Sequence, residues 1–229
     1  MNEMTLPVSI TAKRARLCAI ILVSAFCSLS LHADNAHLAL EARSAQYNQN
    51  YLVAIRLYTR ILRSSPYAVS ALSGRGQSYF ASDKMGPAIA DFTRWRATDS
   101  ANPYASIWLY LAKARSGSRD GRGLPLVKSS SNSDRWPRPV IEYLAGRTAW
   151  DAMFDTALKA VGTLRERELC EAEFFFAENS LASGKESLAM GGFNVARGSR
   201  CKQERLLQSL SASEYAWLYR VGYRPHPVQ

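Results

Sequence analysis

A pattern of residues that recurs after 34 positions in the first half of the chain constrains its fold more than any other feature. In both copies, large, small and aromatic side chains come in nearly the same order. The first copy consists of Leu38, Ala42, Ala45, Ala54, Tyr58 and Ile61, and the second of Leu72, Gly76, Tyr79, Ala88, Phe92 and Trp95. A period of about 34 residues is typical of repeats built from two antiparallel helices. Because one such unit cannot bury its apolar face alone, the sequence predicts a stack of helical hairpins.

Prolines and changes in composition divide the chain into three parts. We expect N-terminal hairpins over residues 34–115, an irregular insertion rich in Gly, Ser and Arg over 116–139, and C-terminal helices over 140–229. Pro66 and Pro103 mark the ends of the first two hairpins, because the residue before a proline disfavours helix. The predicted fold class is therefore all-α: a short solenoid of helical hairpins with a degenerate middle and an irregular insertion.

The repeat returns near the end of the chain. We expect helices over 140–150, with Trp150 buried, and over 153–164, followed by a closing repeat that begins at Cys170. Its small and large positions then fall on Ala177, Gly184, Ala189, Phe193 and Ala196. A last helix over 204–219 is rich in leucine and aromatic residues. It either docks on the closing repeat as a cap or offers a surface for a partner or a homodimer.

Three segments carry a resemblance to a known family. They are PYASIWLYLA at 103–112, Trp136-Pro137 followed by IEYLAG at 141–146, and CEAEFFF at 170–176 followed by Gly184 and Phe193. These segments resemble the tetratricopeptide repeat (TPR) superfamily and, more narrowly, the NlpI-type TPR proteins of the bacterial envelope. The resemblance implies an adaptor that brings cell-wall hydrolases and an envelope protease together.

The first 33 residues have the layout of a secretory signal peptide. Three basic residues precede an apolar run over 17–31, which is shorter than the roughly 20 residues that span a bilayer. We expect cleavage after Ala33, with cleavage after Ser30 or retention as an uncleaved anchor as alternatives. No comparable run follows in the sequence, so we expect a periplasmic protein without an integral membrane segment in its mature chain.

A lipid anchor is not expected, although the founding members of the NlpI-type family are lipoproteins. A lipoprotein signal places a small residue directly before the modified cysteine. In this chain the large residues Leu17 and Phe26 precede Cys18 and Cys27. Attachment to the outer membrane is therefore doubtful.

The register of the repeat also selects candidate partner-binding positions on the first helix of each hairpin, where the concave face of the stack is expected. They are Ala39, Arg43 and Gln46 in the first repeat, Ser73, Gln77 and Phe80 in the second, and Phe174, Glu178 and Leu181 in the closing repeat. Phe174, Phe175 and Phe176 together span about 200° of helix circumference. We expect these rings mainly in the core, with Phe174 facing the groove as the alternative.

Cys170 and Cys201 are predicted to form a disulfide. In the repeat register one begins the first helix of a hairpin and the other ends the second, and these places are neighbours in an antiparallel pair. An exported chain meets an oxidising compartment, which favours the bond. Two buried free thiols are the alternative.

Little in the sequence indicates catalysis. Glu166, Glu168, Glu171, Glu173 and Glu178 alternate with basic residues, and we expect them to form a solvated helix face. Histidine is scarce, so neither a metal site nor a cofactor is predicted. The formal net charge of +10 comes without a nucleic-acid-binding module. We therefore expect non-catalytic binding of protein or peptide partners, and no nucleic acid. Binding of an anionic polymer or cell-wall glycan through the arginines of 116–139 is the alternative.

Overall fold

The structure, a computed structural model, describes residues 34–118, 124 and 135–223, and that part of the chain is helical without a strand. A first helix occupies residues 34–47. The later elements are α2 (Tyr51–Ser64), α3 (Val69–Ala81), α4 (Met85–Thr98), α5 (Pro103–Arg115), α6 (Arg138–Leu144), α7 (Trp150–Lys159), α8 (Gly162–Ala182), α9 (Glu186–Ala196), the 3-10 turn η2 (Ser199–Cys201) and α10 (Arg205–Arg220). The predicted all-α class is confirmed. The expected signal peptide and most of the expected insertion lie outside the described residues.

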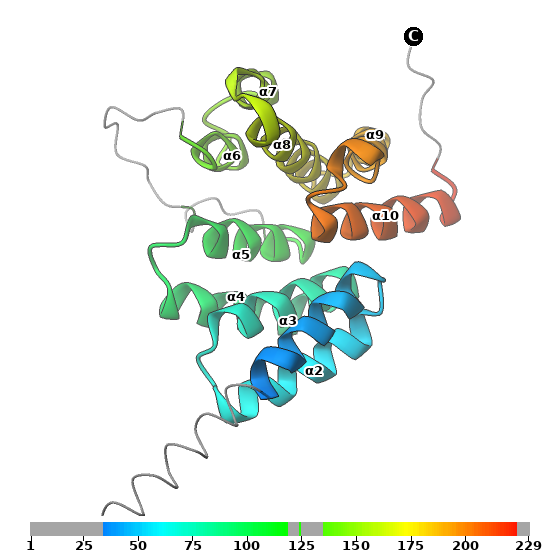
Figure 1. Ribbon diagram of the computed structural model, residues 1–229. Helices are drawn as coiled ribbons and strands as arrows, with labels where there is room; N and C mark the ends of the chain where they lie inside the picture. Colours follow the sequence, from blue (N-terminus) through cyan, green and yellow to red (C-terminus); the bar gives the residue numbers. More distant parts are fainter. Residues whose placement is uncertain (1–33, 119–123, 125–134, 224–229) are drawn as a thin grey trace, which may run out of the picture.

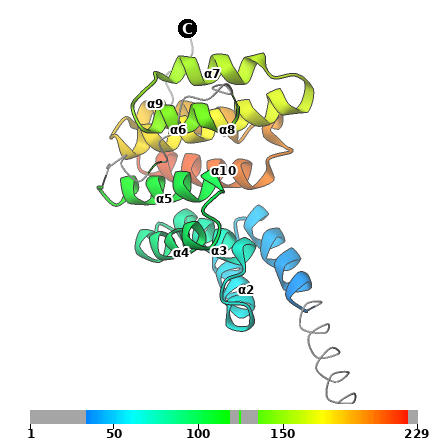
Figure 2. The ribbon, with the colours of Figure 1, turned by 90° about the vertical axis from the view of Figure 1, so that its left-hand side faces the viewer.

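Helices that follow one another in the sequence pack against one another in space, as in a helical repeat stack. Figure 1 shows the hairpins formed by the helix over 34–47, α2, α3 and α4 on one side of the molecule, and α6 to α9 on the other. Helices α5 and α10 lie at the level between them, as the second view also shows (Figure 2). Helix α10 packs mainly on α9 and also contacts α8 and α3. The last helix therefore joins the two ends of the stack.

Small residues at the repeat positions let neighbouring helices approach closely. Ala42, Ala54 and Ala88 are fully buried between helices. A Cβ atom built on Gly76 would lie 2.5 Å from Cε1 of Phe92, which is closer than real Cβ contacts allow. The order of small and aromatic residues in the sequence thus predicts the helix contacts correctly.

The two halves share one aromatic core, centred on Trp108 of α5. Its ring centroid lies 5.5 Å from those of Phe80 and Phe174, 5.8 Å from that of Phe92 and 6.2 Å from that of Phe175. Rings at these separations attract one another in addition to the area that they bury. The expectation of a core position for the three consecutive phenylalanines is confirmed for Phe174 and Phe175.

The middle of the chain departs from the predicted boundaries. The helix expected over 140–150 ends at Leu144, because Gly146 adopts a positive φ of 71° and its amide bonds back to the carbonyl of Tyr143. Trp150 begins the next helix and is 53% exposed, so its predicted burial is wrong. The expected helix over 153–164 is also interrupted, because α7 ends at Lys159.

The predicted disulfide is confirmed. The Sγ atoms of Cys170 and Cys201 are 2.06 Å apart, and their Cα atoms are 5.6 Å apart. The bond joins α8 to η2, directly before α10 begins. It therefore fixes the point from which α10 sets out across the stack.

Candidate partner-binding groove

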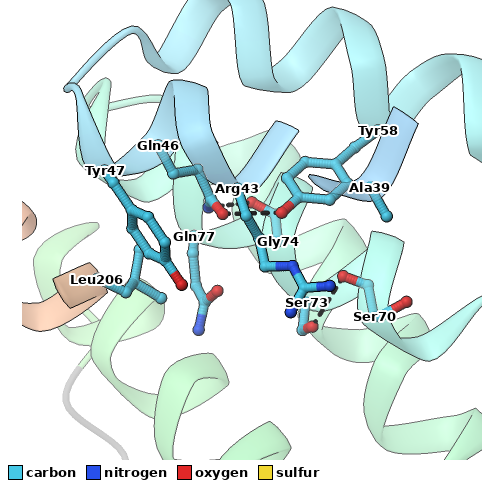
Figure 3. Close-up of a pocket in the computed structure, with 10 residues that line it drawn as sticks. All are labelled: Ala39, Arg43, Gln46, Tyr47, Tyr58, Ser70, Ser73, Gly74, Gln77 and Leu206. Atoms are coloured by element: carbon cyan, nitrogen blue, oxygen red, sulfur yellow. Dashed lines mark hydrogen bonds between the residues drawn. The ribbon is translucent and has the colours of Figure 1, made fainter. Parts of the chain in front are cut away.

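The predicted partner-binding residues of the first two repeats meet around one open cavity of about 270 Å³. Five of the nine line it, and they are Ala39, Arg43, Gln46, Ser73 and Gln77. Tyr47, Tyr58 and Leu206 contribute further walls, the last of them from α10 (Figure 3). The structure thus brings these residues together, and their role in binding stays a prediction.

The floor of this cavity is held by internal hydrogen bonds. Gln46 is buried, and its amide nitrogen donates to the carbonyl of Gly74 at 2.9 Å and to Oγ of Ser78 at 3.0 Å. Its amide oxygen accepts from the Tyr58 hydroxyl at 2.8 Å (Figure 3). Burial raises the pKa of Tyr58 to about 12, so this hydroxyl stays a donor at neutral pH. Gln46 therefore shapes the cavity, since its own polar atoms already have partners.

Arg43 provides the free charge of the cavity. Its side chain is exposed, and Figure 3 shows the guanidinium extending towards Ser70 and Ser73. Among the described residues it forms no ion pair with a carboxylate. A guanidinium at the mouth of a cavity attracts an anionic group on a ligand.

A second cavity of about 230 Å³ adjoins the first, because Gln77 and Leu206 line both. Its other walls are Trp95, Asn102, Tyr104, Trp108, Glu171, Phe175, Glu204 and Leu207. Its residues come from α3, α4, α5, α8 and the start of α10. We call the two adjoining cavities the groove.

Glu171 is the main buried carboxylate of the groove. Its Oε2 accepts hydrogen bonds from the Tyr104 hydroxyl and from Nε1 of Trp136, both at 2.7 Å. Burial raises the pKa of Glu171, and these two donors partly offset the effect. The expectation that the glutamates of α8 form a solvated face is therefore wrong for Glu171, and also for the fully buried Glu178.

The remaining predicted binding residues lie elsewhere. Phe80 and Phe174 are buried in the aromatic core, which corrects the alternative that Phe174 faces the groove. Glu178 has no exposed surface, and Leu181 is partly buried beside a third cavity of about 690 Å³. In the closing repeat, Phe174 and Glu178 are therefore covered, and Leu181 alone of the three predicted positions lines a cavity.

An ion network explains why the closing repeat is covered. Nη1 of Arg115 lies 3.0 Å from Oε2 of Glu178 and 3.2 Å from Oε1 of Glu214, and Nη2 lies 3.7 Å from Oδ1 of Asp83. Burial raises the pKa of Glu178 to about 8, although Arg115 lowers it, and the nearby charge of Glu214 adds to the rise. Because Glu214 belongs to α10, the network attaches this helix to α5 and α8.

The sequence contained a signal for this network that the repeat register did not use. Glu214 lies four residues from both Leu210 and Leu218, so it shares the apolar face of α10 with them. A carboxylate on a buried face requires a partner, and Arg115 supplies it.

Helix α10 also contacts the N-terminal hairpins. Ser209 donates to the carbonyl of Gln46 at 2.9 Å, and the Tyr51 hydroxyl bonds Ser213 at 2.9 Å. The guanidinium of Arg205 lies 4.5 Å from the ring centroid of Tyr47. The expectation that the last helix docks on the closing repeat is confirmed, and α10 also extends beyond it to the N-terminal hairpins. The alternative surface for a partner or a homodimer stays a prediction.

No model of a known protein family matches this sequence, and no curated protein matches it. The fold class therefore rests on the geometry of the structure. It is a helical-repeat, TPR-like fold with an open groove. No helix in the described ranges is long and apolar enough to cross a membrane. Within the same ranges, no cluster of His, Cys, Asp and Glu side chains has the arrangement of a metal site.

Proposed function

We propose that this protein is an exported, non-catalytic TPR-like adaptor that binds protein or peptide partners in the groove. The observation that carries the proposal is the convergence of Ala39, Arg43, Gln46, Ser73 and Gln77 on one open cavity. The floor of that cavity is fixed before a ligand arrives, which reduces the entropy cost of binding. Arg43 supplies a charge without a competing internal partner.

The cellular role in the proposal rests on the resemblance to NlpI-type proteins. Such a protein would act in the periplasm and hold cell-wall hydrolases or a protease. The disulfide between Cys170 and Cys201 supports an oxidising location, because such bonds persist outside the reducing cytosol. The signal-peptide layout of residues 1–33 supports export in the same way.

Crosslinking and pull-down from the native envelope tests the proposal. The double variant Arg43→Glu with Gln77→Ala reverses the free charge and removes a wall of both cavities. We expect it to lose partner capture. Its thermal unfolding midpoint should fall only slightly, because Arg43 is exposed, whereas Gln77→Ala removes the amide oxygen that can accept from the buried Trp108 indole.

The matched control is Arg60→Glu, which makes the same charge change at an exposed position on α2 outside the groove. We expect it to capture partners as the wild type does. Equal capture by all three proteins would overturn the proposal. Equal loss in both charge variants, with a steep dependence on salt, would favour the alternative of anionic-polymer binding.

A further inference from the structure

The second cavity of the groove differs in chemistry from the first. Four aromatic side chains line it: Trp95, Tyr104, Trp108 and Phe175. Two carboxylates, Glu171 and Glu204, line it as well. Aromatic faces and carboxylates both attract organic cations, and their combination is typical of sites for ammonium or guanidinium groups.

The two carboxylates lack a direct cationic partner. Among the described residues, neither Glu171 nor Glu204 forms an ion pair with a Lys or Arg side chain. The two donors to Glu171 are the neutral Tyr104 hydroxyl and Trp136 indole. Arg167 is exposed and lowers the pKa of both carboxyl groups only from a distance, whereas burial raises both. A cation in the cavity would therefore stabilise both charges.

Trp95 provides an independent indication of a ligand. It is 5% exposed, lines the same cavity, and its indole Nε1–H has no hydrogen-bond acceptor within the described chain. Leaving a buried donor without an acceptor costs about 1–3 kcal/mol. Because this nitrogen has almost no accessible surface, an acceptor reaches it only when the indole turns towards the cavity, and the carbonyl of a bound peptide would favour that turn.

The disulfide places the two carboxylates in the same cavity. Glu171 follows Cys170 directly, and the backbone nitrogen of Glu204 donates to the carbonyl of Cys201 at 2.9 Å. Glu204 is also the N-cap residue of α10, but its side chain accepts no capping hydrogen bond. Its carboxylate is therefore available to the cavity instead of being used to begin the helix.

We propose that this cavity is a subsite for a basic side chain, lysine or arginine, of a peptide held in the groove. The cation lies between Glu171 and Glu204 against the aromatic walls, and a peptide carbonyl accepts from Trp95. The proposal rests on the function proposed above and specifies its ligand. Arg43 repels a cation from the adjoining cavity, so the groove distinguishes a basic residue from its neighbours by position.

Nuclear magnetic resonance on the full-length, 15N-labelled protein tests the subsite. The probes are three capped tripeptides, Ala-X-Ala, in which X is lysine, arginine or the uncharged isostere norleucine. We expect the lysine and arginine peptides to shift the indole N–H signals of Trp95 and Trp108 saturably, and the norleucine peptide to leave them in place. Trp95→Phe assigns the Trp95 signal.

Charge variants of Glu204 provide the second arm. We expect Glu204→Gln to weaken binding of the lysine peptide by about tenfold, the usual loss for one charged hydrogen bond. Glu204→Lys places a cation in the cavity and should abolish binding. Asp155→Asn, an exposed carboxylate on α7, is the matched control and should bind as the wild type does. Unchanged thermal midpoints establish that the variants fold.

Two results would overturn the subsite: the norleucine peptide causing the same shifts, or Glu204→Gln binding the lysine peptide as tightly as the wild type. The absence of any shift with the basic peptides would do the same. This failure is distinct from failure of the proposed function. If Arg43→Glu with Gln77→Ala loses envelope partners while the basic peptides do not bind, the function stands and the subsite does not. If the peptides bind but no envelope partner is captured, the subsite stands and the proposed function does not.

Discussion

The concave side of this molecule has two ends that the repeat register treats alike and the structure treats differently. Arg43 and Glu178 occupy the same register position in the first and the closing repeat. Arg43 is exposed at the mouth of a cavity, whereas Glu178 has no exposed surface and is paired with Arg115. The difference arises from α10, which lies over one end and reaches only the edge of the other. The repeat register thus identifies which residues share the concave face, but elements outside the repeat, such as α10, determine whether that face is open.

The two ends also satisfy their polar groups in different ways. At the open end, the neutral side chain of Gln46 bonds both Tyr58 and Ser78, so the cavity needs no charge to hold its shape. At the covered end, two carboxylates share one buried guanidinium. Removing one partner of a buried ion network leaves an uncompensated charge, which costs far more than breaking a neutral surface contact.

The largest expected effect comes from Arg115→Met, which keeps much of the apolar stem and removes the charge. We expect the free energy of unfolding to fall by about 3–5 kcal/mol, because the buried carboxyl groups of Glu178 and Glu214 then lose the guanidinium donor that they share. Chemical denaturation measures the change. Arg147→Ala, which breaks the more exposed pair with Glu142, is the control and should cost less than about 1 kcal/mol. Equal costs for the two variants would mean that the network does not hold the covered end.

Much of this architecture could be predicted from the sequence, because it depends on local order. The small and aromatic positions of the repeat predicted the hairpin contacts, and the same register paired Cys170 with Cys201. It also selected the residues around Arg43 that line one cavity. Each of these inferences requires only that neighbouring helices pack in sequence order.

What the sequence did not predict depends on contacts between distant elements. The sequence pattern predicts a solvated face for Glu178, because its partners, on α5 and α10, lie 63 residues before it and 36 residues after it. The pattern predicts a buried Trp150 because it continues one helix over 140–150, whereas the chain leaves the helix before Gly146. The second cavity does not follow from the repeat, because the disulfide brings Glu204 to Glu171.

A smaller effect is expected from pH. In the folded chain the pKa of Glu178 is raised to about 8 from its ordinary 4.5, so the folded state holds a proton that the unfolded state has lost. Stability from this group is therefore complete below about pH 4.5 and falls as the pH rises towards 8. Stability should therefore fall between pH 5 and 7, which denaturation at each pH measures.

Glu178→Gln is the matched variant for the pH measurement, because it keeps the shape and removes the titration. Its stability should vary less between pH 5 and 7 than that of the wild type. A wild-type profile that rises with pH, or one that is unchanged in Glu178→Gln, would contradict the assignment.

Glycine variants test whether both ends rely on the same close packing of helices. A Cβ on Gly76 would meet Phe92 at 2.5 Å, and one on Gly192 would meet the Ala177 Cβ at 2.9 Å. We expect Gly76→Ala and Gly192→Ala each to cost about 1–3 kcal/mol, because the neighbours must shift.

The adjacent residue Gly191 provides the control. Nothing lies within 4 Å of its Cβ position, so Gly191→Ala should stabilise α9 by about 0.5–1 kcal/mol. Thermal unfolding measures both changes in stability. A loss for Gly192→Ala together with a gain for Gly191→Ala would show that the cost at Gly192 comes from contact with the neighbouring helix and not from helix propensity. A cost at Gly192 but none at Gly76 would mean that only the covered end depends on close packing, and that the hairpins around the groove can adjust to a partner.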